Sequence, residues 1–241
     1  MLLSNNDIKR ELVGANNISI HPLNLDNIKG SSVNLTASNM AWRVSDKNSA
    51  VIGDVIKIPP HDTVCIYTKE AIWVSRRIGG TYHPRVSLVS KGLAHISTTL
   101  DPAWYGISLV AVNNPTRNEI EIRVGESFVS IMFYYLKTPS ALNIIENSPS
   151  RPDIARGFKL SHKEDLFLQE QWHRTNQGIS DRMLKSDSYK EFTKEEREET
   201  VKKEQKKKEF RQTFWFPLLM ALIGAIVGSG LSTLLAYQFL R

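Results

Sequence analysis

Short runs of β-forming residues, separated by turn residues, fill the first half of this 241-residue chain and limit its fold more than any other feature. The alternation of apolar and charged residues is clearest from Glu119 to Val124, where it places the Ile and Val side chains on one face. Regularly spaced short strands of this kind are typical of a β-sandwich or jelly roll. We therefore predict an all-β domain that follows one helix at 7–12, capped by Asn5 or Asn6, with strands at 17–20, 32–37, 55–58, 63–67, 71–74, 107–113, 119–123 and 128–136.

The segment from Pro84 to Gly106, PRVSLVSKGLAHISTTLDPAWYG, carries the side chains best suited to a ligand. An Arg followed by a turn suits phosphate oxygens, because a guanidinium donates paired hydrogen bonds and successive backbone amides form an anion-binding nest. An Asp three residues before a Trp suits a deoxyribose and its base. We predict that a deoxynucleotide contacts Arg85, Ser87, Lys91, His95, Asp101 and Trp104.

This segment resembles the second and third motifs of the dUTPase and dCTP deaminase superfamily, which run approximately PRSGLAxKxG and GxIDxDYxG. Further resemblances follow in the family's order at Leu3–Ile8, Ile18–Leu23, Ser31–Leu35, Ile58–Glu70 and Val124–Phe133. The resemblance implies a distorted jelly roll of the β-clip type over residues 1–138. It also implies a homotrimer, with pockets formed between neighbouring chains.

The resemblance places an alanine where the deaminases carry their general acid/base glutamate. That glutamate lies three residues before the Asn that closes the strand after the Asp motif, and this Asn is Asn114, so the position is Ala111. A methyl group cannot carry a proton between water and a cytosine ring, and such assistance is worth about 10²–10⁴ in rate. We therefore expect no cytosine deamination.

Hydrolysis of dUTP does not need that glutamate, so Asp101 remains a candidate catalytic base. The pocket departs from the family's pattern elsewhere: Asn34 stands at the expected Asp, Val86 at the phosphate-binding Ser and Ser130 at the usual Gln. Asn34 lacks the charge that would help to hold a hydrated Mg²⁺. We predict no metal site and no cofactor in the protein itself, with any Mg²⁺ arriving on a bound triphosphate.

These departures favour a deoxynucleotide-binding protein that has lost turnover, such as a sensor or effector. Two alternatives stay open. One is an active enzyme, for which a dUTP diphosphatase is favoured over a dCTP deaminase, and the other is a scaffold that binds a protein partner.

Each candidate residue also has a structural interpretation. Asp101 before Pro102 is an ordinary turn starter, and Arg85 and Lys91 are typical solvated charges at strand ends. Trp104 suits core or trimer-interface packing, and a structural role is the commoner one for a histidine such as His95.

The C-terminal part differs in character from the rest. Residues 214–239 contain no charged side chain, and a membrane span needs about 20 such residues. Lysines are concentrated between 202 and 211, whereas only Arg241 follows the apolar run, and this asymmetry favours the N-terminal side in the cytoplasm. We predict a single transmembrane helix at 213–240 that acts as a tail anchor, with the β domain in the cytoplasm.

Between the β domain and this helix we predict a charged, mostly helical linker over residues 139–212. The formal net charge of +6 comes mostly from the lysines before the predicted anchor. Because this basic stretch has no interleaved aromatic residues, we expect it to contact anionic lipid and not nucleic acid.

Overall fold

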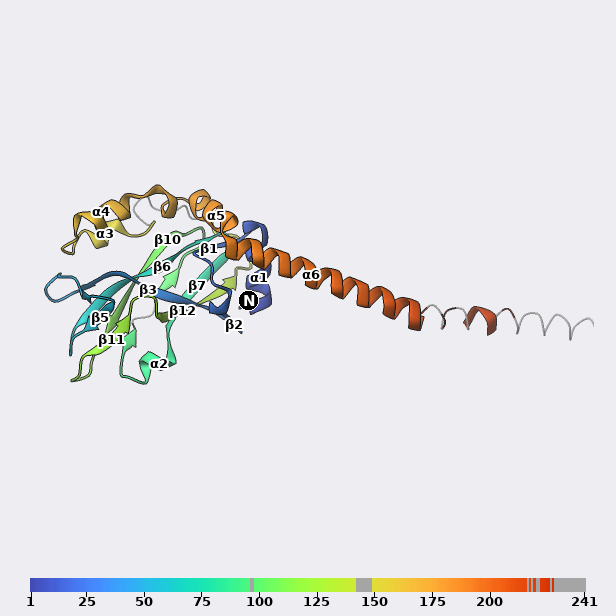
Figure 1. Ribbon diagram of the computed structural model, residues 1–241, viewed down its shortest axis with the longest axis horizontal. Coiled ribbons are helices and arrows are strands. Elements are labelled where there is room, and N and C mark those ends of the chain that lie inside the picture. Colours follow the sequence, from blue (N-terminus) through green and yellow to red (C-terminus); the bar gives the residue numbers. More distant parts are fainter. Residues whose placement is uncertain are drawn as a thin grey trace, which may run out of the picture. The chain divides into compact units, whose positions relative to one another are not determined.

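The computed structural model describes residues 1–95, 98–141, 149–215, 217, 219, 222–225 and 227. The chain divides into two units, Met1–Lys190 and Glu191–Arg241. The first unit contains the β-sheets and three helices that follow them in the sequence (Figure 1). The second contains most of the long helix α6 (Asp187–Phe210), which is rich in Lys and Glu, and the short π-helical turn Arg211–Trp215.

Within the described residues, nine strands form the main sheet. Seven of them lie in the order β8-β10-β6-β3-β12-β7-β9, while β1 pairs with β6 and β2 pairs with β3. Their bounds are β1 (Ile18–His21), β2 (Ile28–Lys29), β3 (Ser32–Arg43), β6 (Thr63–Val74), β7 (Ile78–Pro84), β8 (Ala94–His95), β9 (Thr99–Leu100), β10 (Tyr105–Asn113) and β12 (Ser127–Tyr135). A smaller sheet has the order β11-β5-β4, with β4 (Val51–Ile52), β5 (Val55–Ile58) and β11 (Ile120–Arg123).

The predicted β domain is therefore present, and the alternation seen in the sequence appears in β11. Ile120 and Ile122 are buried there, whereas Glu121 and Arg123 are exposed. The strands expected at 63–67 and 71–74 are instead one continuous strand, β6. The buried Glu70 between them does not interrupt the strand, because its carboxylate accepts hydrogen bonds from the backbone N and the Oγ1 of Thr36 in β3, both at 2.8 Å.

Helix α1 (Asn5–Leu12) is capped by Ser4, one residue before the expected caps. The Ser4 Oγ accepts a hydrogen bond from the Asp7 backbone N at 3.3 Å, and the Asp7 carboxylate accepts one from the Ser4 backbone N at 3.0 Å. This reciprocal capping box satisfies two backbone donors at once, which explains why the helix begins here.

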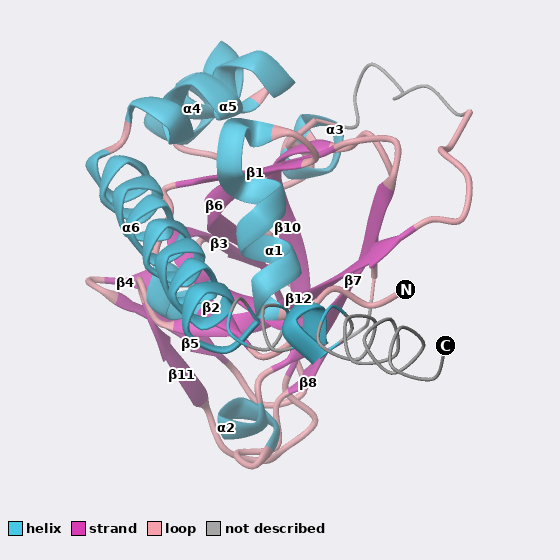
Figure 2. Ribbon diagram, turned by 90° about the vertical axis from the view of Figure 1, so that its right-hand side faces the viewer, coloured by secondary structure: helices cyan, strands magenta, loops and turns pink. Residues whose placement is uncertain are grey.

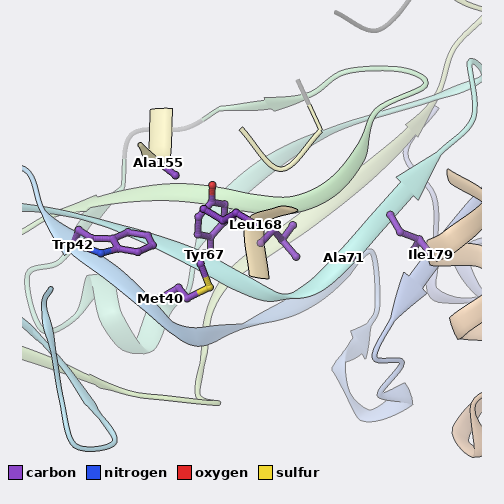
Figure 3. Packing of buried hydrophobic residues seen from close by; sticks show 8 residues of the cluster. Met40, Trp42, Tyr67, Ala71, Ala155, Leu168 and Ile179 are labelled. Atoms are coloured by element: carbon purple, nitrogen blue, oxygen red, sulfur yellow. The ribbon is translucent and has the colours of Figure 1, made fainter. Parts of the chain in front are cut away.

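Helices α3 (Pro152–Ala155), α4 (His162–Gln169) and α5 (Asn176–Lys185) lie over β1, β6 and β10 (Figures 1 and 2). They join the sheet through one buried apolar cluster (Figure 3), which consists of Met40, Trp42, Tyr67, Ala71, Ile107, Ala155, Leu168 and Ile179. The ring of Phe158 stacks on Trp42 with centroids 5.6 Å apart. Burial of such aromatic and aliphatic surface stabilises the helical segment on the sheet.

The predicted transmembrane helix is not supported. Among the residues that the structure describes, no helix is both long enough and apolar enough to cross a membrane. Helix α6 is long but highly charged and ends at Phe210, and most of positions 213–240 lie outside the described residues. The predictions of a tail anchor and of a membrane location with a cytoplasmic β domain are therefore wrong, and the inferred lipid partner loses its basis.

Candidate functional site

A cavity of 370 Å³ lies between β7, β9, β10 and the segment that forms α3. A volume of this order suits a small-molecule ligand. The cavity is lined by Tyr82, Thr98, Thr99, Leu100, Asp101, Trp104, Ser108, Leu109, Val110, Ala111, Arg151 and Ile154. The structure thus brings together three positions that the sequence singled out: Asp101, Trp104 and Ala111.

Asp101 begins the turn that leads from β9 to β10. Backbone groups close this turn, because the Trp104 N donates to the Asp101 carbonyl at 3.2 Å. The Asp101 carboxylate accepts a hydrogen bond from the Thr99 Oγ1 at 3.5 Å, and the side chain is exposed. Since the turn does not use the carboxylate, its oxygens are available to a ligand.

Ala111 lies on β10 and lines the cavity. Nearby, the Tyr82 and Ser108 hydroxyls are hydrogen-bonded at 2.6 Å, and burial raises the pKa of Tyr82 further above its ordinary value. Among the described residues that line the cavity, Asp101 carries the only carboxylate and Arg151 the only cation. Position 111, where the resemblance to the deaminases predicts a glutamate, offers no proton carrier.

The remaining predicted contacts do not line this cavity. Arg85, Ser87 and Lys91 lie on or beside the short helix α2 (Val86–Val89), at the end of the domain opposite to α3 (Figure 1). His95 lies in β8, and its backbone pairs with Val112 of β10; its side chain is outside the described part of the structure. Within a single chain, the predicted nucleotide contacts therefore lie in two separate places, the cavity and the region of α2.

Two of the departures noted in the sequence are partners in the structure. The Ser130 Oγ donates a hydrogen bond to the Asn34 Oδ1 at 2.8 Å, where β12 pairs with β3. Asn34 is buried, so this bond satisfies an acceptor that would otherwise be costly to bury. The described residues contain no cluster of three or more His, Cys, Asp or Glu side chains that could hold a metal ion.

One wall of the cavity is held in place by a buried hydrogen-bond network around Ser150, here called the Ser150 anchor. The Tyr67 hydroxyl donates to the Ser150 carbonyl at 2.6 Å, and the Ile107 N donates to the Ser150 Oγ at 3.1 Å. The Ser150 Oγ is also 2.8 Å from the His173 Nδ1. Gly106 completes the anchor, because a Cβ there would lie 2.4 Å from the Ser150 N.

His173 is fully buried within this anchor. Its Nε2 lies 2.8 Å from the Phe167 carbonyl, which can only accept, so Nε2 carries the proton and Nδ1 accepts from the Ser150 hydroxyl. Burial lowers the pKa of His173, because the charged imidazolium is disfavoured away from water.

We expect this histidine to make stability depend on pH. An unfolded histidine titrates near 6.5, whereas folded His173 stays neutral to a lower pH. Its contribution is therefore complete above about pH 6.5 and is lost as the pH falls through the lowered pKa. Urea unfolding at pH 7.5 and 5.5 checks this: His173→Gln should lose less stability on acidification than the wild type.

The comparison with a variant is needed because other buried groups titrate too. Burial lowers the pKa of His21 in the same sense, while it raises the pKa of Glu70, with the opposite effect on stability. An identical acid sensitivity in His173→Gln would contradict the expectation.

A family model described as dCTP deaminase-like matches residues 2–136. This chain belongs to the dCTP deaminase-like family. It is 30% identical over 142 residues to a probable deoxyuridine 5'-triphosphate nucleotidohydrolase of Sulfolobus islandicus rod-shaped virus 1, a match that covers 58% of this chain and 87% of the relative. It is 28% identical over 141 residues to a dCTP deaminase of Pyrococcus horikoshii, covering 58% and 85% of the two chains.

Solved structures that resemble this chain are more distant in sequence. The crystal structure of 2'-deoxycytidine 5'-triphosphate deaminase from Agrobacterium tumefaciens matches with a TM-score of 0.46 at 14% identity, over 55% of this chain and 46% of that one. The dUTPase from phage phi11 of S. aureus matches with a TM-score of 0.38 at 10% identity, over 53% and 95%.

Sequence analysis missed most of the cavity residues, and Arg151 and Ile154 are the two that lie beyond the family match. Both follow the dCTP deaminase-like match, which ends at residue 136, in a stretch whose Ser-Pro-Ser-Arg-Pro sequence indicates only an extended exit from the domain. Motif comparison had no pattern to apply there. The one local signal is an Arg two residues before an Asp, and this signal does not specify a pocket.

Proposed function

We propose that this dCTP deaminase-like chain binds a deoxynucleotide without deaminating it and acts as a sensor or effector. The observation that carries the proposal is that Asp101 and Ala111 line the same cavity. Asp101 offers a charged acceptor, whereas the Ala111 methyl cannot transfer a proton. Membership of the family supports a deoxynucleotide as the class of ligand.

In this proposal Asp101 accepts a hydrogen bond from a hydroxyl of the deoxyribose, and the half-buried Trp104 packs against the ligand. Hydrogen bonds to charged groups contribute about 1.5–3 kcal/mol, so Asp101 should matter for affinity. Trp104 offers a flat apolar surface on which a sugar or base can pack.

We also propose a homotrimer. Arg85, Ser87 and Lys91 lie away from the cavity of their own chain, so they can contact its ligand only if a neighbouring chain presents them. A solution mass near three times the 27.4 kDa of one chain, measured by light scattering, would support this assembly. Weaker nucleotide binding by Arg85→Ala would place α2 at the site.

An active dUTP diphosphatase is the second candidate. It is favoured by the carboxylate of Asp101, which the turn leaves available to orient a water molecule, and this reaction makes no use of position 111. A relative that shares 30% identity is named as a probable dUTP nucleotidohydrolase. Any Mg²⁺ would then enter with the triphosphate.

Incubation of the full chain with dUTP, dCTP and the other deoxynucleoside triphosphates separates these candidates when binding and products are both measured. We expect binding without release of ammonia, and Asp101→Ala should weaken it by about tenfold or more. Asp54→Ala, which removes an exposed carboxylate from the turn between β4 and β5, is the matched control and should bind like the wild type.

Release of diphosphate from dUTP, lost in Asp101→Asn, would favour the diphosphatase. Ammonia release from dCTP would contradict the argument from Ala111. A chain that binds none of these nucleotides would favour the protein-binding scaffold.

A further inference from the structure

The cavity has a wall that the family domain does not provide. Arg151 and Ile154 line it together with Asp101, although they follow the last family-matched residue by more than ten positions. The Ser150 anchor ties this wall to β6 and β10, since Tyr67 and Ile107 both hydrogen-bond to Ser150. The place of Arg151 beside the cavity is therefore set by buried contacts, not by a loose surface loop.

The backbone at this point has an uncommon conformation. Ser150 and Arg151 both have positive φ, at 56° and 41°, which non-glycine residues seldom adopt. Such conformations persist where surrounding contacts hold them, and the Tyr67 hydroxyl contacts the carbonyls of both residues, at 2.6 and 3.4 Å. This turn lets Ser150 point into the anchor while the next residue lines the cavity.

The guanidinium of Arg151 has a partner that it can exchange. Its Nε and Nη2 donate to the two carboxylate oxygens of Asp153 at 3.0 and 2.8 Å. Both side chains are well exposed, at 44% and 37%, and ion pairs so accessible to water contribute little. Asp153 thus holds the two donors parallel, in the geometry that also suits a phosphate.

We propose that Arg151 is an anion-binding residue of this pocket, which exchanges Asp153 for a phosphate group of a deoxynucleotide whose sugar contacts Asp101. The inference rests on the proposed function and extends it: the segment after the family domain contributes a cation to the site of its own chain. Without Arg151, the only charged side chain in the described cavity lining would be Asp101. Its negative charge would disfavour binding of a polyanion such as a nucleoside triphosphate.

Calorimetric titration of the full chain with deoxyuridine and with the non-hydrolysable α,β-imido analogues of dUTP and dCTP tests this assignment. We expect Arg151→Gln to weaken binding of the preferred triphosphate analogue by about tenfold and to leave deoxyuridine binding unchanged. Asp153→Asn removes the competing carboxylate and should strengthen triphosphate binding by about twofold to fivefold. Arg156→Gln is the matched control, because Arg156 is exposed, contacts Asp165 and does not line the cavity.

Unchanged triphosphate binding by Arg151→Gln would overturn the inference and leave the proposed function standing. An equal loss for deoxyuridine and the triphosphate would assign Arg151 a packing role and would also overturn it. A wild-type chain that binds none of these ligands would overturn both proposals.

Discussion

Replacing Gly106 with alanine is expected to lower the free energy of unfolding by about 3 kcal/mol or more. The new Cβ would lie 2.4 Å from the Ser150 N and 2.7 Å from the Ser150 Oγ, and both atoms are held by the anchor. Gly106 also has a φ of +137°, which side chains other than glycine rarely tolerate. Relief of the clash requires Ser150 to move, and with it the wall that carries Arg151.

Gly53→Ala is the matched control, because Gly53 also has positive φ, at +64°, but a Cβ added there would meet no atom within 4 Å. Gly53→Ala should lower the free energy of unfolding by only about 1 kcal/mol, because the positive φ is the only cost. Urea denaturation of both variants gives the comparison. Equal losses would show that close approach to Ser150 does not restrict position 106.

His173→Ala is expected to lower the free energy of unfolding by about 3 kcal/mol. The substitution removes the Nδ1 partner of the Ser150 hydroxyl, which keeps only the weaker contact with the residue 173 carbonyl at 3.3 Å, and it leaves the Phe167 carbonyl without the Nε2 donor. It also removes a buried ring that stacks on Phe167 with centroids 5.0 Å apart, so a cavity adds to the lost hydrogen bonds.

The exposed His162, at the first turn of α4, provides the control, and His162→Ala should change stability by less than about 0.5 kcal/mol. Thermal and urea unfolding at pH 7.5 measure both variants. A His173→Ala protein as stable as the His162→Ala protein would mean that the anchor does not support the fold.

Local sequence patterns predicted the β domain well, because the alternation of buried and exposed side chains can be recognised within each strand by itself. The charged and apolar residues of β11 are an example, and the expected span of β5 agrees with the observed one, Val55–Ile58. The split expected within β6 was wrong, because the sequence does not show that Thr36 of another strand would satisfy Glu70. The transmembrane helix was predicted from an apolar composition alone, and no helix within the described residues is long and apolar enough to cross a membrane.

The candidate site was predicted in part for the same reason. Asp101, Trp104 and Ala111 belong to contiguous motifs, and folding brings them to one cavity. Arg85, Ser87 and Lys91 belong to an equally clear motif, yet α2 carries them elsewhere on the chain, so their part in the site stays a prediction.

Residue identities close together in the chain were enough to indicate the family and the β architecture of the first 136 residues, and to predict that Ala111 stands where the deaminases carry their acid/base. The presence of Arg151 in the same cavity as Asp101, in contrast, became visible only in the folded chain. This placement depends on Ser150 reaching the space that Gly106 leaves open, 44 positions earlier, and on a buried histidine that fixes Ser150 there. Such packing between distant segments is a property of the folded surfaces, and no local pattern in the sequence encodes it.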